Sequence, residues 1–80
     1  MNTEDIQARL NRIMRTVFDN DALNVKRTTT AQDVEGWDSL THINLIVAVE
    51  REFKIRFATS EIQSLKNVGD LMDFIARKTT

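Results

Sequence analysis

Residues 38–53 read DSLTHINLIVAVEREF and carry the clearest helical pattern in the chain. Asp38 is a good N-cap residue, because its side chain can accept hydrogen bonds from the free N–H groups of a first helical turn. A helix is therefore expected over about 39–53. Its apolar residues occupy more than one stripe, which predicts that this helix is central and the most buried. These residues are Leu40, Ile43, Leu45, Ile46, Val47, Val49 and Phe53.

Ser39 is the first residue of this helix. Its hydroxyl would be exposed beside backbone N–H groups that have no partner within the helix. The N-terminal end of a helix carries a partial positive charge and favours a phosphate. The sequence therefore predicts that Ser39 is a site where a phosphate-bearing group is attached.

Two other interpretations of the same segment have to be weighed. Asp38, Ser39 and His42 are the residue types of a hydrolytic triad, but the Gly-x-Ser-x-Gly elbow is missing. An acid next to the serine in sequence is also badly placed to orient a histidine. In a purely structural interpretation, Asp38 caps the helix and Trp37 packs as a hydrophobic staple on the side chain at position 42. For an isolated Asp-Ser-Leu triplet this structural interpretation is the default.

The remaining sequence predicts helices on both sides of this segment. The expected helices cover about 4–18, 39–53, 60–65 and 68–78, with Thr3 as the first N-cap. Residues 19–38 form a long connection, which in a compact domain is often functional. Leu23, Val25 and Val34 are expected to anchor it to the core. The expected fold class is an all-α four-helix bundle, with three main helices, one short helix and a long first loop, in a single domain 1–80.

The composition excludes several classes of protein. The net charge is −1, from 12 acidic and 11 basic residues, whereas nucleic-acid binding needs a basic face. There is no cysteine for a disulfide, a thiolate metal site or a thiol nucleophile. No apolar run reaches the length of a membrane span, and the acidic residues 1–5 do not look like a signal peptide. We expect a cytoplasmic monomer with no catalytic residues, no metal, no nucleic-acid partner and no membrane insertion.

The order and spacing of four segments resemble an acyl carrier protein of the phosphopantetheine-binding family. DSL at 38–40 opens the long apolar helix, IxF at 55–57 follows it, and VGDLxxFI stands at 68–75. Upstream, DVEG at 33–36 matches the acid–aliphatic stretch that such carriers have before the serine. The resemblance covers nearly the whole chain, and it favours attachment over the other two interpretations.

The resemblance implies a carrier rather than an enzyme. Ser39 would receive 4′-phosphopantetheine from coenzyme A through a Mg²⁺-dependent phosphopantetheinyl transferase, with Asp38 and Leu40 flanking the attachment point. The terminal thiol would carry an acyl group as a thioester. An acyl-loading ligase or transacylase would supply this cargo, and synthase or transferase partners of fatty-acid, lipid or polyketide-type synthesis would use it.

Some alternatives remain open. The chain could be an aminoacyl or peptidyl carrier of a nonribosomal pathway, or, from another class, an unmodified helical adaptor for protein interactions. The cargo could lie in solution or insert between helices, near Ile43, Val47, Ile62 and Leu71.

Two departures from strongly acidic housekeeping carriers predict a specialised member with its own partners. Thr41 and Asn44 stand where acids are common, and Arg51 interrupts the acidic stretch at 50–52; complementary charge governs partner choice. Trp37 stands where a small or aliphatic residue is usual, either as a staple or as a partner contact. The expected recognition residues are Trp37, Thr41, His42, Asn44 and Ile62.

Overall fold

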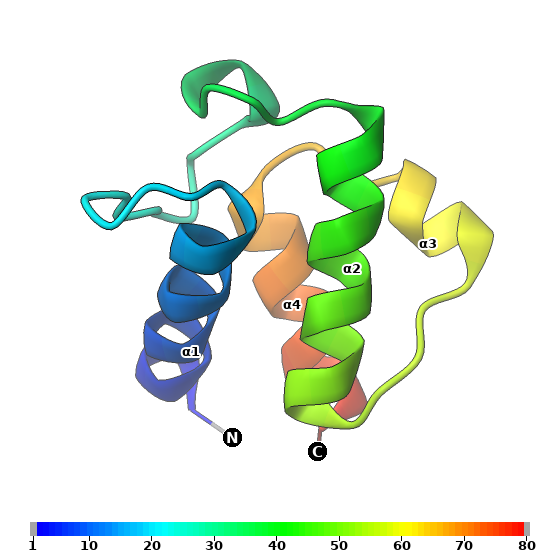
Figure 1. The fold of residues 1–80 in the computed structure, drawn as a ribbon. Helices are drawn as coiled ribbons and strands as arrows, with labels where there is room; N and C mark the ends of the chain where they lie inside the picture. Colours follow the sequence, from blue (N-terminus) through cyan, green and yellow to red (C-terminus); the bar gives the residue numbers. More distant parts are fainter. Residues whose placement is uncertain (1, 80) are drawn as a thin grey trace.

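The computed structural model describes residues 2–79 and consists of helices joined by loops. The elements are α1 (Thr3–Val17), the 3-10 turn η1 (Ala31–Asp33), α2 (Ser39–Phe53), α3 (Thr59–Gln63) and α4 (Val68–Lys78). This confirms the all-α four-helix class with a long loop between the first two helices. In Figure 1 the long loop arches over one end of the bundle, and the short α3 flanks α2 on the side away from α1.

Helix boundaries differ from the expected ones at α1 and α3. The N-cap of α1 is Asn2, not Thr3: the Asn2 Oδ1 atom accepts a hydrogen bond from the Asp5 N–H at 2.8 Å. Asparagine caps as well as threonine does, so neighbouring capping residues leave the start ambiguous by one position. Helix α3 begins at Thr59, where the Glu61 carboxylate accepts the Ala58 N–H at 2.7 Å, and it ends at Gln63 rather than at residue 65.

The core lies between α1, α2 and α4. Each of these helices contributes apolar residues three or four positions apart, which places them on one face. The buried cluster contains Ile6, Leu10, Met14, Val25, Leu45, Ile46, Val49, Phe53, Ile55, Val68, Leu71, Met72 and Ile75. Both α2 and α4 contact α1, and the cluster joins all three helices.

The prediction that α2 is the most buried helix is wrong. Leu40, Ile43 and Val47 are 71%, 50% and 41% exposed, and they form a row along one side of the helix. The other side of α2 supplies the core, and the five-residue α3 is too short to cover the rest. Helix α2 therefore presents an apolar row to solvent, beginning next to Ser39.

The long loop is fastened to the core as expected. Val25 and Val34 are buried, and Leu23 is partly buried against the core cluster. An unexpected polar contact helps: the buried Asn11 side chain of α1 accepts a hydrogen bond from the Val25 N–H at 2.7 Å. Because Val25 is fully buried, its N–H would otherwise lack a partner.

A second attachment of the loop depends on Gly69. The Gly69 N–H donates to the Arg27 carbonyl at 2.8 Å, and the neighbouring Val68 N–H donates to Thr29 at 2.8 Å. A Cβ atom at position 69 would lie 2.9 Å from that Arg27 oxygen. Glycine thus lets the loop backbone approach the start of α4.

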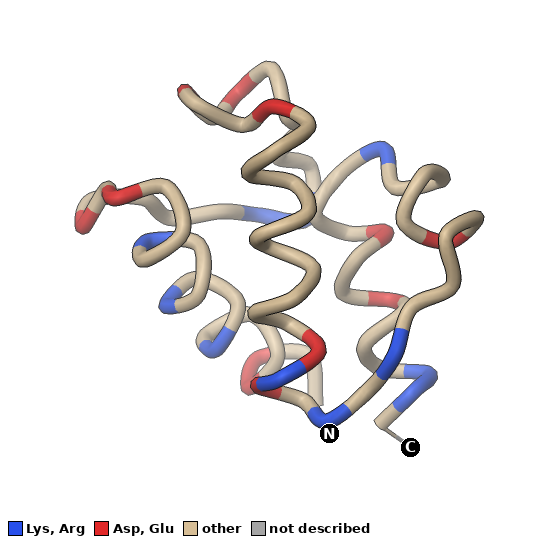
Figure 2. The backbone as a smooth tube through the Cα atoms, turned by 45° about the vertical axis from the view of Figure 1, so that its right-hand side comes forward, with Lys and Arg blue, Asp and Glu red and all other residues tan. Residues whose placement is uncertain are grey.

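Charged residues are distributed over the whole fold. Basic segments recur along α1, while acidic and basic segments alternate at the C-terminal end of α2 (Figure 2). Within residues 2–79, no helix is long and apolar enough to cross a membrane.

Candidate functional site

A reciprocal cap fixes the start of α2. The Asp38 Oδ1 atom accepts hydrogen bonds from the N–H groups of Leu40 and Thr41, each at 3.0 Å. In return the Thr41 hydroxyl oxygen accepts the Asp38 N–H at 2.8 Å, which completes a capping box. The same hydroxyl lies 2.7 Å from the Gly36 carbonyl, to which it can donate. Gly36 has φ +87°, a left-handed conformation that suits glycine and turns the chain into the helix.

The cap favours the ionised form of Asp38. The hydrogen bond from the Thr41 N–H is the main reason that the pKa of Asp38 is lowered from 3.8, against a smaller opposing effect of desolvation. The Thr41 hydroxyl and the Leu40 N–H lower it further. This corrects the expectation of unpartnered N–H groups beside Ser39, because a neighbouring carboxylate already accepts two of them.

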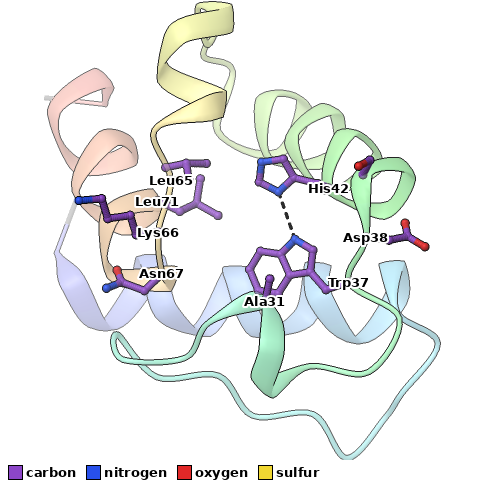
Figure 3. A pocket seen from close by; sticks show the side chains of 9 residues that line it. Ala31, Trp37, Asp38, His42, Leu65, Lys66, Asn67 and Leu71 are labelled. Carbon is purple, nitrogen blue, oxygen red and sulfur yellow. Dashed lines mark hydrogen bonds between the residues drawn. The ribbon is translucent and has the colours of Figure 1, made fainter.

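Ser39 is exposed at the first position of α2. Within residues 2–79, its hydroxyl makes no hydrogen bond. The residue borders an open pocket of about 320 Å³ between the start of α2, the end of the long loop and the α3–α4 connection (Figure 3). The other lining residues are Ala31, Trp37, Asp38, His42, Leu65, Lys66, Asn67 and Leu71.

Trp37 packs on His42, as the staple interpretation predicted. The Trp37 Nε1–H donates to His42 Nδ1 at 3.1 Å, and the two rings stack with centroids 6.1 Å apart (Figure 3). The Phe18 ring lies on the same indole, at a centroid distance of 5.6 Å. These contacts hold the end of the long loop against the first turns of α2.

His42 also reaches α3. Its Nε2 atom lies 3.2 Å from the carbonyl oxygen of Ile62. Because Nδ1 accepts from Trp37, this pattern assigns the proton to Nε2, which then donates to Ile62. His42 is therefore a half-buried bridge between the long loop and α3, not a freely solvated side chain near the serine.

The geometry does not make a hydrolytic triad. Both ring nitrogens of His42 have other partners, and the Asp38 carboxylate faces the first turn of α2. The Ser39 hydroxyl bonds to neither of them within the described part of the chain. A nucleophile needs a base within hydrogen-bonding distance, and the described residues place none at Ser39. Residues 2–79 also contain no cluster of His, Cys, Asp or Glu that could hold a metal.

The expected recognition residues are not equivalent. Trp37, His42 and the half-buried Ile62 form one connected group beside the pocket. Asn44 is exposed on α2, while the Thr41 hydroxyl is used in the cap. The expected lining for inserted cargo is only partly present, since Leu71 borders the pocket beside Ser39 whereas Ile43 and Val47 face solvent.

Sequence reasoning missed most of the pocket wall across from Ser39. Leu65, Lys66 and Asn67 come from the α3–α4 connection. Asn67 gave the only usable signal, because its side chain caps α4 by accepting the Asp70 N–H at 2.9 Å. The other two are placed by tertiary packing alone.

Comparison with known proteins agrees with this architecture. Residues 8–75 match the family described as a phosphopantetheine attachment site. The chain is 32% identical to an acyl carrier protein of Acidothermus cellulolyticus, over 99% of this chain and 94% of that protein. It is 33% identical to one of Caulobacter vibrioides, over 94% and 96% of the two chains.

Solved structures are similar along almost the whole fold. The holo acyl carrier protein of Geobacter metallireducens superposes with a TM-score of 0.86 at 49% identity, covering 91% of this chain and 84% of that one. The acyl carrier protein of Thermotoga maritima gives a TM-score of 0.84 at 28% identity, covering 98% and 91%. A 68-residue family match and relatives aligned over nearly their full length lead to one conclusion: this chain belongs to the acyl carrier proteins, the carriers of the phosphopantetheine-binding family.

Proposed function

We propose that Ser39 is the residue to which 4′-phosphopantetheine is attached, within a single carrier domain. The observation that carries this proposal is a serine hydroxyl that is exposed, without a hydrogen-bond partner in residues 2–79, and held at the rigidly capped start of a helix. The prosthetic group supplies the thiol that a chain without cysteine lacks, and that thiol carries the acyl group as a thioester.

The residues of this chain position the serine and do no chemistry on it. Asp38 and Thr41 fix where α2 begins, so that position 39 lies outside the core. The contact between Trp37 and His42 fixes the end of the long loop beside the pocket that Ser39 borders. Since no side chain among residues 2–79 is hydrogen-bonded to the Ser39 hydroxyl, the modifying transferase would supply the base.

The decisive experiment is attachment to the intact protein. Incubation with coenzyme A, Mg²⁺ and a broad-specificity phosphopantetheinyl transferase should add the mass of one phosphopantetheine to the wild type. Ser39→Ala should gain nothing, while Ser60→Ala, which removes another exposed serine, should be modified normally. No gain on the wild type would leave an unmodified adaptor, and a gain on Ser39→Ala would place the site elsewhere.

We further propose that the partners differ from those of acidic housekeeping carriers. The first turn of α2 holds no acid, and an exposed apolar row begins at Leu40. Asn44 and the edge formed by Trp37, His42 and Ile62 would complete the contact. The loaded protein should therefore turn over poorly with housekeeping ketosynthase and transacylase enzymes. Turnover equal to that of an acidic carrier would remove this proposal.

A further inference from the structure

Two grooves meet at Arg51, near the C-terminal end of α2. One, of about 420 Å³, lies between α1 and α2 and is bordered by Arg12 and Arg51. The other, of about 590 Å³, lies at the end of α2 and is bordered by Arg51, Lys54 and Arg56. We call the two together the basic grooves. Their four cations come from α1, from α2 and from the segment that follows α2.

Each of the basic grooves is also lined by a carboxylate, Glu52 in the groove between α1 and α2 and Glu50 in the other. Glu50 Oε2 accepts the Phe57 N–H at 2.9 Å, and Glu52 pairs with Arg9 at 3.6 Å. Arg9 in turn lies over the Phe53 ring, 5.8 Å from its centroid. Both acids thus have internal partners, but only Glu52 is paired with a cation, and Glu50 keeps its negative charge beside Arg51 and Lys54.

The four cations of the basic grooves have no such partners. Among residues 2–79, no hydrogen bond, ion pair or ring contact engages the side chains of Arg12, Arg51, Lys54 or Arg56. The cations outnumber the two glutamates of the same grooves, and an anionic ligand would be attracted by the excess positive charge. With Arg9 and the two glutamates included, this surface holds five cations (Arg9, Arg12, Arg51, Lys54, Arg56) and two carboxylates, so it is net positive although the chain as a whole is at −1.

The basic grooves also contain apolar surface. Ile13, Val17 and Ala48 line the groove between α1 and α2, and Val47 and Ile55 line the other. Val47 is the last member of the exposed apolar row of α2, which starts next to Ser39. Arg51 is twelve residues after Ser39, which is roughly 18 Å along a helix axis. A partner bound here would share α2 with the attachment site.

We propose that the basic grooves bind an acidic, partly apolar segment of a partner protein. Its carboxylates would face Arg12, Arg51, Lys54 and Arg56, and its apolar side chains would cover Val47 and Ala48. A mixed apolar and charged surface fits a protein segment better than nucleic acid, whose binding depends chiefly on uninterrupted cationic contacts. The proposal rests on the carrier function only in that the partner would act on cargo at Ser39.

A defined peptide tests this inference without any prosthetic group. The ¹⁵N-labelled Ser39→Ala protein is titrated with an 18-residue amphipathic helical peptide of Glu and Leu, and with its Lys and Leu counterpart. The acidic peptide should shift amide signals in residues 12–17 and 47–56, and more strongly at low salt. The basic peptide should not bind there.

Charge reversals in the same background then identify the cations. Arg51→Glu should weaken binding of the acidic peptide by about 2- to 30-fold. A charge reversal removes one exposed ion pair and adds a repulsion of similar size, and this fold-change is the sum of the two converted to affinity. Arg12→Glu and Arg56→Glu, on either side of Arg51, should act similarly. Lys26→Glu, which reverses an exposed loop cation without a side-chain partner in residues 2–79, should change nothing.

Several results would overturn the proposal. These are signal shifts spread over all cationic surfaces, an equal loss with Lys26→Glu, or no binding of the acidic peptide. Tighter binding of short duplex DNA or of anionic phospholipid vesicles at the same residues would assign the surface to a polyanion instead. The peptide experiments use the Ser39→Ala protein and do not depend on modification of Ser39. Their failure would therefore not bear on the attachment of phosphopantetheine, and the reverse also holds.

Discussion

The contact between Trp37 and His42 should be an energetic link between the long loop and α2. Trp37→Phe removes the indole N–H but keeps an aromatic ring near Phe18. His42→Leu keeps a side chain of similar size but removes both ring nitrogens, and with them the contact to Ile62. The two variants and their combination form a double-mutant cycle, which isolates the interaction that the two residues share.

The structure gives the expected size of this interaction. A partly buried neutral hydrogen bond contributes about 0.5–1.5 kcal/mol net, and the 3.1 Å distance between Trp37 Nε1 and His42 Nδ1 is normal for one. Ring stacking at 6.1 Å adds little to the cycle, because the Phe side chain of the Trp37→Phe variant retains part of it. We expect a coupling free energy of about 1 kcal/mol. For a domain of this size that corresponds to roughly 4–8 °C in Tm.

Urea unfolding of the four proteins, followed by circular dichroism, measures the coupling. Fluorescence is unsuitable because Trp37 is the single tryptophan of the chain. His42→Leu alone should cost more than Trp37→Phe alone, since it loses two hydrogen bonds rather than one. Additivity within about 0.3 kcal/mol would refute the reasoning. Trp37 would then be free to serve chiefly as a partner contact.

Three other predictions concern the elements that support the site. Asn11→Ala leaves the buried Val25 N–H without an acceptor and should cost about 1–3 kcal/mol, with earlier hydrogen exchange of that amide; unchanged exchange would contradict it. Gly69→Ala should destabilise, because the added Cβ overlaps the Arg27 carbonyl at 2.9 Å, and overpacking of about 1–3 kcal/mol outweighs the gain of at most about 1 kcal/mol in helix propensity. An increase in Tm would reverse that ranking. The lowered pKa of Asp38 predicts that its contribution to the free energy of unfolding is fully present above pH 3.8, the ordinary pKa of the carboxyl. The contribution is lost as the pH falls through the lower pKa of the folded state. Asp38→Asn keeps a capping side chain without this titration, so its free energy of unfolding, measured with urea at acid pH, should fall less steeply with pH.

The start of α2 was predictable from sequence because its determinants are local. Asp38, Thr41 and Gly36 lie within six residues, and each acts on the backbone next to it. Capping preferences report such short-range contacts directly. The position of Ser39 at the helix start followed from Asp38 as the N-cap, whereas the part of Thr41 in the cap was not predicted.

Contacts between distant segments left no signal in the sequence. The acceptor of the His42 Nε2–H is a carbonyl twenty residues away, on α3. In the sequence, Asn11 is indistinguishable from the other polar residues of α1. Only the packing of the long loop on α1 shows that its side chain accepts a hydrogen bond from the Val25 N–H. Hydrophobic periodicity failed at α2 for a related reason. It identifies the face that packs on the core, but it does not count the neighbouring helices that would be needed to bury Leu40, Ile43 and Val47.

Net charge also hides how the charges are used. In residues 2–79, three cations form ion pairs within the chain: Arg9 with Glu52, Arg27 with Asp73, and Lys78 with Glu61. The acids whose side chains have no internal partner are Glu4, Asp5, Asp19, Asp21 and Glu35, at the start of α1 and in the long loop. Four of the cations whose side chains have no internal partner in residues 2–79 line the basic grooves. A partner meets the summed field of all charges, and the excess acids and excess cations lie at different places, so a nearly neutral chain can present an acidic loop and a basic helix end to two different surfaces.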